Sequence, residues 1–126
     1  MHAVIETPGF LRDAADAGLS EKRCRELVAA IADDPTQGDL MEGTGGARKV
    51  RFAGRGKGKS GGYRVVTYYA GPDVPVLMLA VFGKGDRDNL SKAERNALRV
   101  ELAGYAQDYR RSARAKVAQL KGRRRK

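Results

Sequence analysis

The sequence predicts a small α+β domain, in which a strand and two helices precede three antiparallel strands and a C-terminal helix. Three observations predict this class. The length of 126 residues fits one domain. The N-terminal third carries apolar stripes at helical spacing behind capping residues, and the middle third carries β-rich runs between glycine and proline turns. We expect the domain to cover residues 1–109 and a basic helical extension or tail to cover residues 110–126.

Capping residues mark the N-terminal elements. Residues 3–6 form a short candidate strand. Thr7-Pro8 then provides an N-cap and a proline at the first helical position, which starts a helix that ends near Gly18. Ser20 caps a second helix, which Asp34-Pro35 stops. The apolar stripe of this helix consists of Cys24, Leu27, Val28 and Ile31.

Three strands follow a glycine-rich loop at residues 36–46, and a last helix follows the strands. The strands are expected at residues 49–53, 63–69 and 76–82. The third is apolar throughout, which is typical of a strand buried on both faces, and the turn at 71–75 predicts an antiparallel hairpin. A capping box of Ser91 and Glu94 starts the last helix. Its stripe is expected to run through Leu98, Leu102, Tyr105 and Tyr109.

The positive charge is concentrated in the C-terminal two-thirds of the chain. The net charge is +10, but residues 1–46 hold four Lys/Arg against nine Asp/Glu, whereas residues 47–126 hold 21 against six. This asymmetry indicates a polyanion partner, and nucleic acid is the commonest one in a cytoplasm. No apolar run is long enough to span a membrane, no signal peptide is evident, and the single cysteine fits a reducing cytoplasm.

One segment, residues 54–64, combines five glycines with Arg55, Lys57, Lys59 and Arg64 and has no acid. Glycine lets a backbone approach a ligand closely, and Lys and Arg bind phosphate, so this segment predicts a surface for a phosphodiester. Its spacing matches a dinucleotide fingerprint and part of a P-loop. Both motifs must open a helix, whereas this segment opens a β-rich run, so we exclude both.

The available chemistry favours RNA cleavage without a metal or cofactor. His2 is the only histidine, which excludes a histidine acid–base pair, and with one cysteine it cannot form a zinc site. Asp86 and Asp88 could meet magnesium, although a solvated turn is favoured. RNA supplies its own nucleophile, the 2′-hydroxyl, and a lysine crowded by other cations has a lowered pKa and can act as a base. DNA would be bound but not cut.

Three segments together resemble RelE/HigB-type toxins of bacterial type II toxin–antitoxin systems, within the RelE/ParE superfamily. They are Gly43-Thr-Gly-Gly-Ala-Arg-Lys-Val-Arg51, Gly58-Lys-Ser-Gly-Gly-Tyr-Arg-Val65 and Val81-Phe-Gly-Lys84, which precedes the Ser-capped helix. The resemblance extends over roughly residues 3–109, includes the order of the elements and leaves the basic tail outside. It implies a small RelE-like domain.

The resemblance also implies an activity. Such toxins are metal-independent endoribonucleases that cut messenger RNA in the ribosomal A site by 2′-hydroxyl attack, and a DNA-binding antitoxin encoded by an adjacent gene inhibits them. Ribosomal RNA is a further expected partner. The implied catalytic residues are Lys57, Lys59, Arg64 and Lys84. The implied RNA-binding residues are Arg48, Lys49, Arg51, Arg55 and Arg87. The base-stacking tyrosine of RelE has no counterpart at residues 88–91.

Two other functions fit the same sequence. A noncatalytic RNA- or ribosome-binding module would use the cations for affinity alone, and a ParE-like toxin would inhibit DNA gyrase on the same fold. The tail at residues 110–126 holds nine Lys/Arg and no acid. It is expected to add nonspecific attraction for ribosomal RNA, with a purely solubilising role as the alternative.

Overall fold

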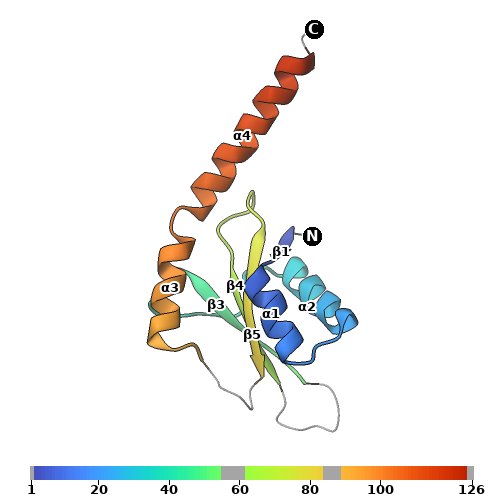
Figure 1. Ribbon diagram of the computed structural model, residues 1–126, viewed down its shortest axis with the longest axis vertical. Helices are drawn as coiled ribbons and strands as arrows, with labels where there is room; N and C mark the ends of the chain where they lie inside the picture. Colours follow the sequence, from blue (N-terminus) through green and yellow to red (C-terminus); the bar gives the residue numbers. More distant parts are fainter. Residues whose placement is uncertain (1, 55–61, 84–88, 125–126) are drawn as a thin grey trace.

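The computed structural model describes residues 2–54, 62–83 and 89–124, with side chains up to residue 121. A five-stranded sheet of order β1-β5-β4-β3-β2 has α1 and α2 on one face and α3 on the other, and α4 extends beyond the sheet (Figure 1). The α+β class is confirmed. The strands are β1 Val4–Glu6, β2 Asp39–Leu40, β3 Ala47–Phe52, β4 Tyr63–Tyr68 and β5 Val76–Gly83. The helices are α1 Pro8–Asp16, α2 Glu21–Asp33, α3 Lys92–Leu102 and α4 Tyr105–Arg124.

The three central strands pair antiparallel, as predicted, and β1 adds a parallel pair. Val4 of β1 lies opposite Val76 of β5, an arrangement that the sequence did not predict because it joins residues far apart in the chain. Beyond the end of β1, the edge of β5 is covered by α1, since the Asp13 carboxylate accepts a hydrogen bond from the Val81 amide at 3.2 Å. This contact satisfies a strand amide that would otherwise lack a partner.

The first face of the sheet forms the larger core. Phe10 of α1, with Leu27 and Ile31 of α2, is fully buried against Val65 and Met78 of the sheet. The two helix starts are those predicted from capping residues. The Thr7 hydroxyl accepts from the Phe10 amide, and the Ser20 hydroxyl accepts from the Arg23 amide. Local signals therefore place both helices, and their apolar stripes bind them to the sheet.

The second face packs against α3. Val66 of β4 and Phe82 of β5 form a core with Leu102 of α3 and neighbouring apolar residues. The capping box is confirmed, because the Ser91 hydroxyl accepts from the Glu94 amide while the Glu94 carboxylate accepts from the Ser91 amide. This box fixes the residue at which α3 begins, and the helix then covers part of this face of the sheet.

The last helix is broken, where the sequence predicted one continuous helix. Ala103 is extended, with ψ 124°, and Gly104 takes a left-handed conformation with φ +84°, so α3 and α4 are separate. Glycine accepts this conformation without the steric cost that other residues have. Tyr105 and Tyr109, which were expected to continue the apolar stripe of this helix, therefore lie on the separate helix α4. Tyr105 packs its ring edge against Tyr68 instead, and its hydroxyl donates to the Pro75 carbonyl at 2.9 Å.

None of the helices in the described parts of the chain is both long and apolar enough to cross a membrane.

Candidate functional site

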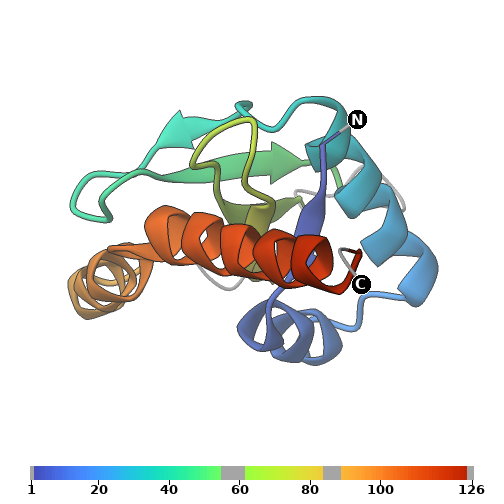
Figure 2. The same ribbon diagram turned by 90° about the horizontal axis from the view of Figure 1, so that it is seen from above.

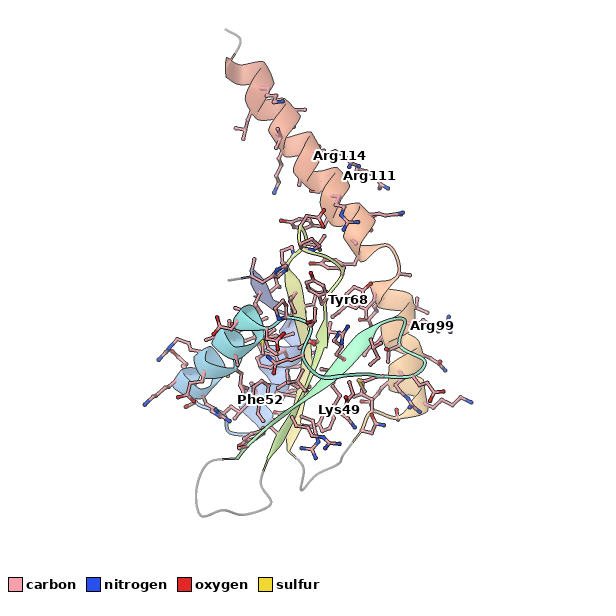
Figure 3. All side chains as sticks on the ribbon, turned by 180° about the vertical axis from the view of Figure 1, so that it is seen from behind. Lys49, Phe52, Tyr68, Arg99, Arg111 and Arg114 are labelled. Carbon is pink, nitrogen blue, oxygen red and sulfur yellow. The ribbon has the colours of Figure 1, made fainter. Side chains whose placement is uncertain are left out.

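Three cations lie together on the face of the sheet that α3 borders. Arg51 of β3 and Arg64 of β4 are direct cross-strand partners, so their side chains leave the sheet on the same face. Lys49 precedes Arg51 by two residues and therefore shares this face (Figure 3). Arg64 is only 7% exposed, whereas Arg51 is exposed. We refer to Lys49, Arg51 and Arg64 as the cationic face.

The cationic face gathers three positive charges on one side of the sheet. Arginine presents several donors in a planar fork that suits phosphate oxygens, and Lys49 adds a third positive charge beside the Arg51–Arg64 pair. The arrangement can therefore bind a phosphodiester and stabilise negative charge that develops on it.

Gly62 lets the start of β4 pass close to the end of β3. A Cβ atom at position 62 would lie 2.9 Å from the Phe52 carbonyl oxygen, closer than real Cβ atoms approach, and 3.7 Å from Nη1 of Arg64. Any larger residue would push the strand away from β3 at this point. The glycine before the Tyr63-Arg64 pair is therefore required by close packing, which explains part of the motif seen in the sequence.

The strand ends beside this cluster lead into the segments that hold the predicted lysines. Phe52 of β3 is paired with Tyr63 of β4, and Tyr63 is paired with Gly83 of β5, so these three ends are neighbours. Residues 55–61 follow β3, and residues 84–88 follow β5. The predicted site residues Arg55, Lys57, Lys59, Lys84 and Arg87 lie outside the described residues, and their roles stay predictions.

Arg48 lies on the opposite face from the other predicted RNA-binding residues of β3. It is one residue from Lys49, and alternation along the strand turns it toward the side of α1 and α2. Its Nη1 donates to the Thr36 carbonyl at 2.9 Å. In this position Arg48 holds the segment that joins α2 to β2, and the structure does not bring it together with Arg51 and Arg64.

A groove beside the cationic face contains a residue that the sequence analysis missed. Lys49 and Arg51 line it from β3, Arg95 lines it from α3, and Asp39 and Glu42 add two carboxylates. The signal for Arg95 was present, because it precedes Leu98 by three residues and so shares the sheet-facing side of α3. The apolar spacing alone does not single out Arg95, because the stripe is defined by its apolar members.

The turn between β2 and β3 explains the Gly-Thr-Gly-Gly segment of the resemblance. Thr44 is fully buried; its hydroxyl donates to the Met41 carbonyl at 2.7 Å and accepts from the Ala47 amide at 3.0 Å. Gly46 has φ +121°, and its backbone lies against the Tyr68 ring. These contacts fix where β3 begins. They thereby fix the positions of Lys49 and Arg51 along the strand.

Histidine and metal chemistry are not found at this cluster within the described residues. The His2 ring donates from Nε2 to the Val74 carbonyl at 2.8 Å and contacts the Tyr69 ring. Val74 follows the far end of β4 from Arg64, so His2 lies away from the cationic face. In the described parts of the chain, no group of three or more His, Cys, Asp or Glu residues could hold a metal ion.

Comparison with known families gives one match that spans nearly the whole chain. A family model described as the RelE toxin of the RelE/RelB toxin–antitoxin system matches residues 3–124. The match continues past residue 109, where the resemblance seen in the sequence ended, and so includes the whole of α4. It covers all three segments on which that resemblance was based.

Proposed function

Because the chain belongs to the RelE family of toxins from toxin–antitoxin systems, we propose that it is an endoribonuclease that cuts messenger RNA in the ribosomal A site. Endoribonuclease activity is general among toxins of this family. The observation that carries the proposal for this chain is the cross-strand pair of Arg51 and Arg64, with Lys49 beside it on the same face.

The proposed reaction uses the substrate's own nucleophile. The 2′-oxygen attacks the adjacent phosphorus, its proton passes to a base, the bond to the 5′-oxygen breaks and that oxygen takes up a proton. The products are a 2′,3′-cyclic phosphate and a 5′-hydroxyl. Arg64 would stabilise the charge on the phosphorane oxygens, which is the stage at which preorganised donors contribute most. Proton transfer is assigned to Lys57 or Lys59 and to Lys84.

The remaining residues of the site would hold the message. We propose that Arg51 and Lys49 bind the phosphates on either side of the scissile bond, together with Arg95, which lines the same groove from α3. Arg55 and Arg87 are proposed to add contacts to the RNA backbone. No metal ion or cofactor is required for this route, since cations of the chain neutralise the phosphate.

The proposed partners follow from the same activity. The message and ribosomal RNA meet the toxin on the ribosome, which places its action in the cytoplasm. A cognate antitoxin that binds DNA is proposed to neutralise it. Two modes of neutralisation are proposed, covering the groove at the exposed Arg51 and displacing α4, whose described side chains are mostly exposed.

The proposal is tested by expression of Arg64 variants in cells. Arg64→Met keeps most of the buried stem and removes the guanidinium, whereas Arg64→Lys keeps the charge and loses the fork. We expect wild type to stop protein synthesis within minutes, Arg64→Met to lose about 10²- to 10³-fold in cleavage rate, and Arg64→Lys to fall between them. Arg12→Met, at an exposed position on α1, serves as the matched control.

The same experiment distinguishes an endoribonuclease from a gyrase inhibitor. A chain that halts DNA replication and causes DNA damage, while protein synthesis continues, would be a gyrase inhibitor and not a nuclease. An Arg64→Met variant that is folded, as judged by its melting temperature, and as toxic as wild type would refute the assigned site.

A further inference from the structure

The helix α4 extends from the domain without burying a side chain of its own. It spans Tyr105–Arg124, 20 residues, or about 30 Å at the usual rise per residue. Among its described side chains, residues 105–121, all are exposed or half-buried. Most helices in proteins are stabilised by packing an apolar face. The outer part of α4 lacks such packing, so its role is expected to depend on what its surface binds.

The base of α4 is firmly attached, which fixes the direction of the helix. Arg110 makes a bidentate pair with Asp73 in the β4–β5 turn, with Nε–Oδ2 at 2.6 Å and Nη2–Oδ1 at 2.8 Å. Tyr105 adds its hydrogen bond to Pro75. Seen from above, α4 crosses over the sheet toward the side of α1 and α2 (Figure 2). The first turns of α4 are thus tied to the domain at two points, and the outer turns extend beyond them.

The outer turns carry a row of cations. Arg111, Arg114 and Lys121 are exposed and spaced by three and seven residues, so they lie on one side of the helix. Figure 3 shows Arg111 and Arg114 extending from the same side of α4. The contact of Arg111 with Asp108, at 3.5 Å between two side chains that are each 72% exposed, is weak. No acid occurs at residues 110–126.

We propose that this cationic row of α4 binds the phosphate backbone of double-helical RNA, at a site separate from the cationic face. Charge complementarity identifies the occupant, since a row of Lys and Arg without acids matches a run of phosphates. RNA helices are recognised mainly through backbone contacts, which need no defined sequence. The choice of RNA rests on the proposed function, because a ribosome brings folded RNA next to the bound message.

The two sites are separated by the length of β4. Tyr68, which packs against the base of α4, lies four residues from Arg64, or about 13 Å along the strand. The α4 row continues outward from that far end. Binding at α4 would therefore anchor the protein without occupying the groove, and it can be removed without altering Arg51 or Arg64.

A second surface of α4 supplies the matched control. Tyr109, Val117 and Leu120 form an apolar stripe with exposed fractions of 38%, 50% and 57%. A protein partner would dock on this stripe, whereas an RNA backbone would contact the cations beside it. Substitutions on the stripe should therefore leave RNA binding unchanged if the proposal is right.

The test measures binding of the full-length protein to a fluorescent RNA hairpin with a continuous double-helical stem. The triple variant Arg111→Gln, Arg114→Gln, Lys121→Gln is compared with the double variant Val117→Gln, Leu120→Gln, after circular dichroism has shown equal helix content. We expect the triple variant to bind at least about tenfold more weakly at ~0.1 M salt, with a slope of log K against log salt smaller by about 3, or about one for each cation removed. The double variant should stay within about twofold of wild type.

Three outcomes would overturn the inference. They are equal affinity of the triple variant and wild type, a larger loss in the double variant, and tighter binding of a DNA duplex of equal length than of the RNA stem. The readout is binding and needs no cleavage. A result that refutes RNA binding by α4 would therefore not affect the proposed nuclease activity. Conversely, uncut message on ribosomes would refute the nuclease activity and would not affect the measured RNA binding by α4.

Discussion

Replacing Thr44 by valine should destabilise the protein without leaving a cavity, because the two side chains differ mainly in the hydroxyl. That hydroxyl is fully buried and joins the Met41 carbonyl, at 2.7 Å, to the Ala47 amide, at 3.0 Å. Thr44→Val leaves both backbone groups buried without this partner. A buried group that loses its partner costs about 1–3 kcal/mol, so the two together should cost about 3 kcal/mol.

The expected loss is measurable by urea unfolding and by thermal melting. For a domain of this size, about 3 kcal/mol corresponds to a melting temperature lower by about 10 °C, and the urea m-value should not change because the surface exposed on unfolding is the same. Thr36→Val is the control, since Thr36 is exposed and its hydroxyl makes a long contact of 3.4 Å to the Asp34 carboxylate. We expect that variant to stay within about 0.5 kcal/mol of wild type. Equal stability of Thr44→Val and Thr36→Val would refute the structural role given to this turn.

Two further predictions concern titratable groups. The hydrogen bond and charge of Arg110 hold the pKa of Asp73 below its ordinary 3.8. Because the pKa is depressed in the folded state, the pair contributes fully to the stability of the fold above that ordinary value. This contribution is lost as the pH falls through the folded-state pKa. The NMR signal of the Arg110 Nε–H should move in that acidic window and should not do so in Asp73→Asn; the same acid response in wild type and Asp73→Asn would contradict the pairing. Burial, with the nearby Glu6 and Glu21 carboxylates, raises the pKa of the Cys24 thiol. Iodoacetamide should therefore alkylate Cys24 more slowly in the folded protein at about pH 8 than in urea, and equal rates would contradict its placement.

Local signals in the sequence predict the elements of this fold well. Thr7, Ser20 and Ser91 are the N-caps of three helices, as expected, because a capping hydroxyl satisfies amides within the next three residues and needs no distant partner. The alternation of the central strands likewise depends on neighbouring residues. Their antiparallel order followed from the turn at residues 71–75, which joins two strands directly.

Features that depend on distant contacts could not be predicted in this way. The pairing of Val4 with Val76 joins the two ends of a long segment, and the break at Gly104 depends on contacts of Tyr105 with the β4–β5 turn. The pair of Arg51 and Arg64 depends on strand register, which no local pattern supplied. For the same reason the sequence grouped Arg48 with its neighbours, whereas the structure turns it to the other face.

The measurement that tests the central claim most directly is the mapping of message ends on translating ribosomes treated with the purified protein. Wild type, Arg64→Met and Arg12→Met are compared, each with and without EDTA. We predict cuts within A-site codons by wild type and Arg12→Met, with 2′,3′-cyclic phosphate ends, no dependence on EDTA and almost no cutting by Arg64→Met. Intact message with wild type, or cuts that Arg64→Met makes at the wild-type rate, would contradict the account.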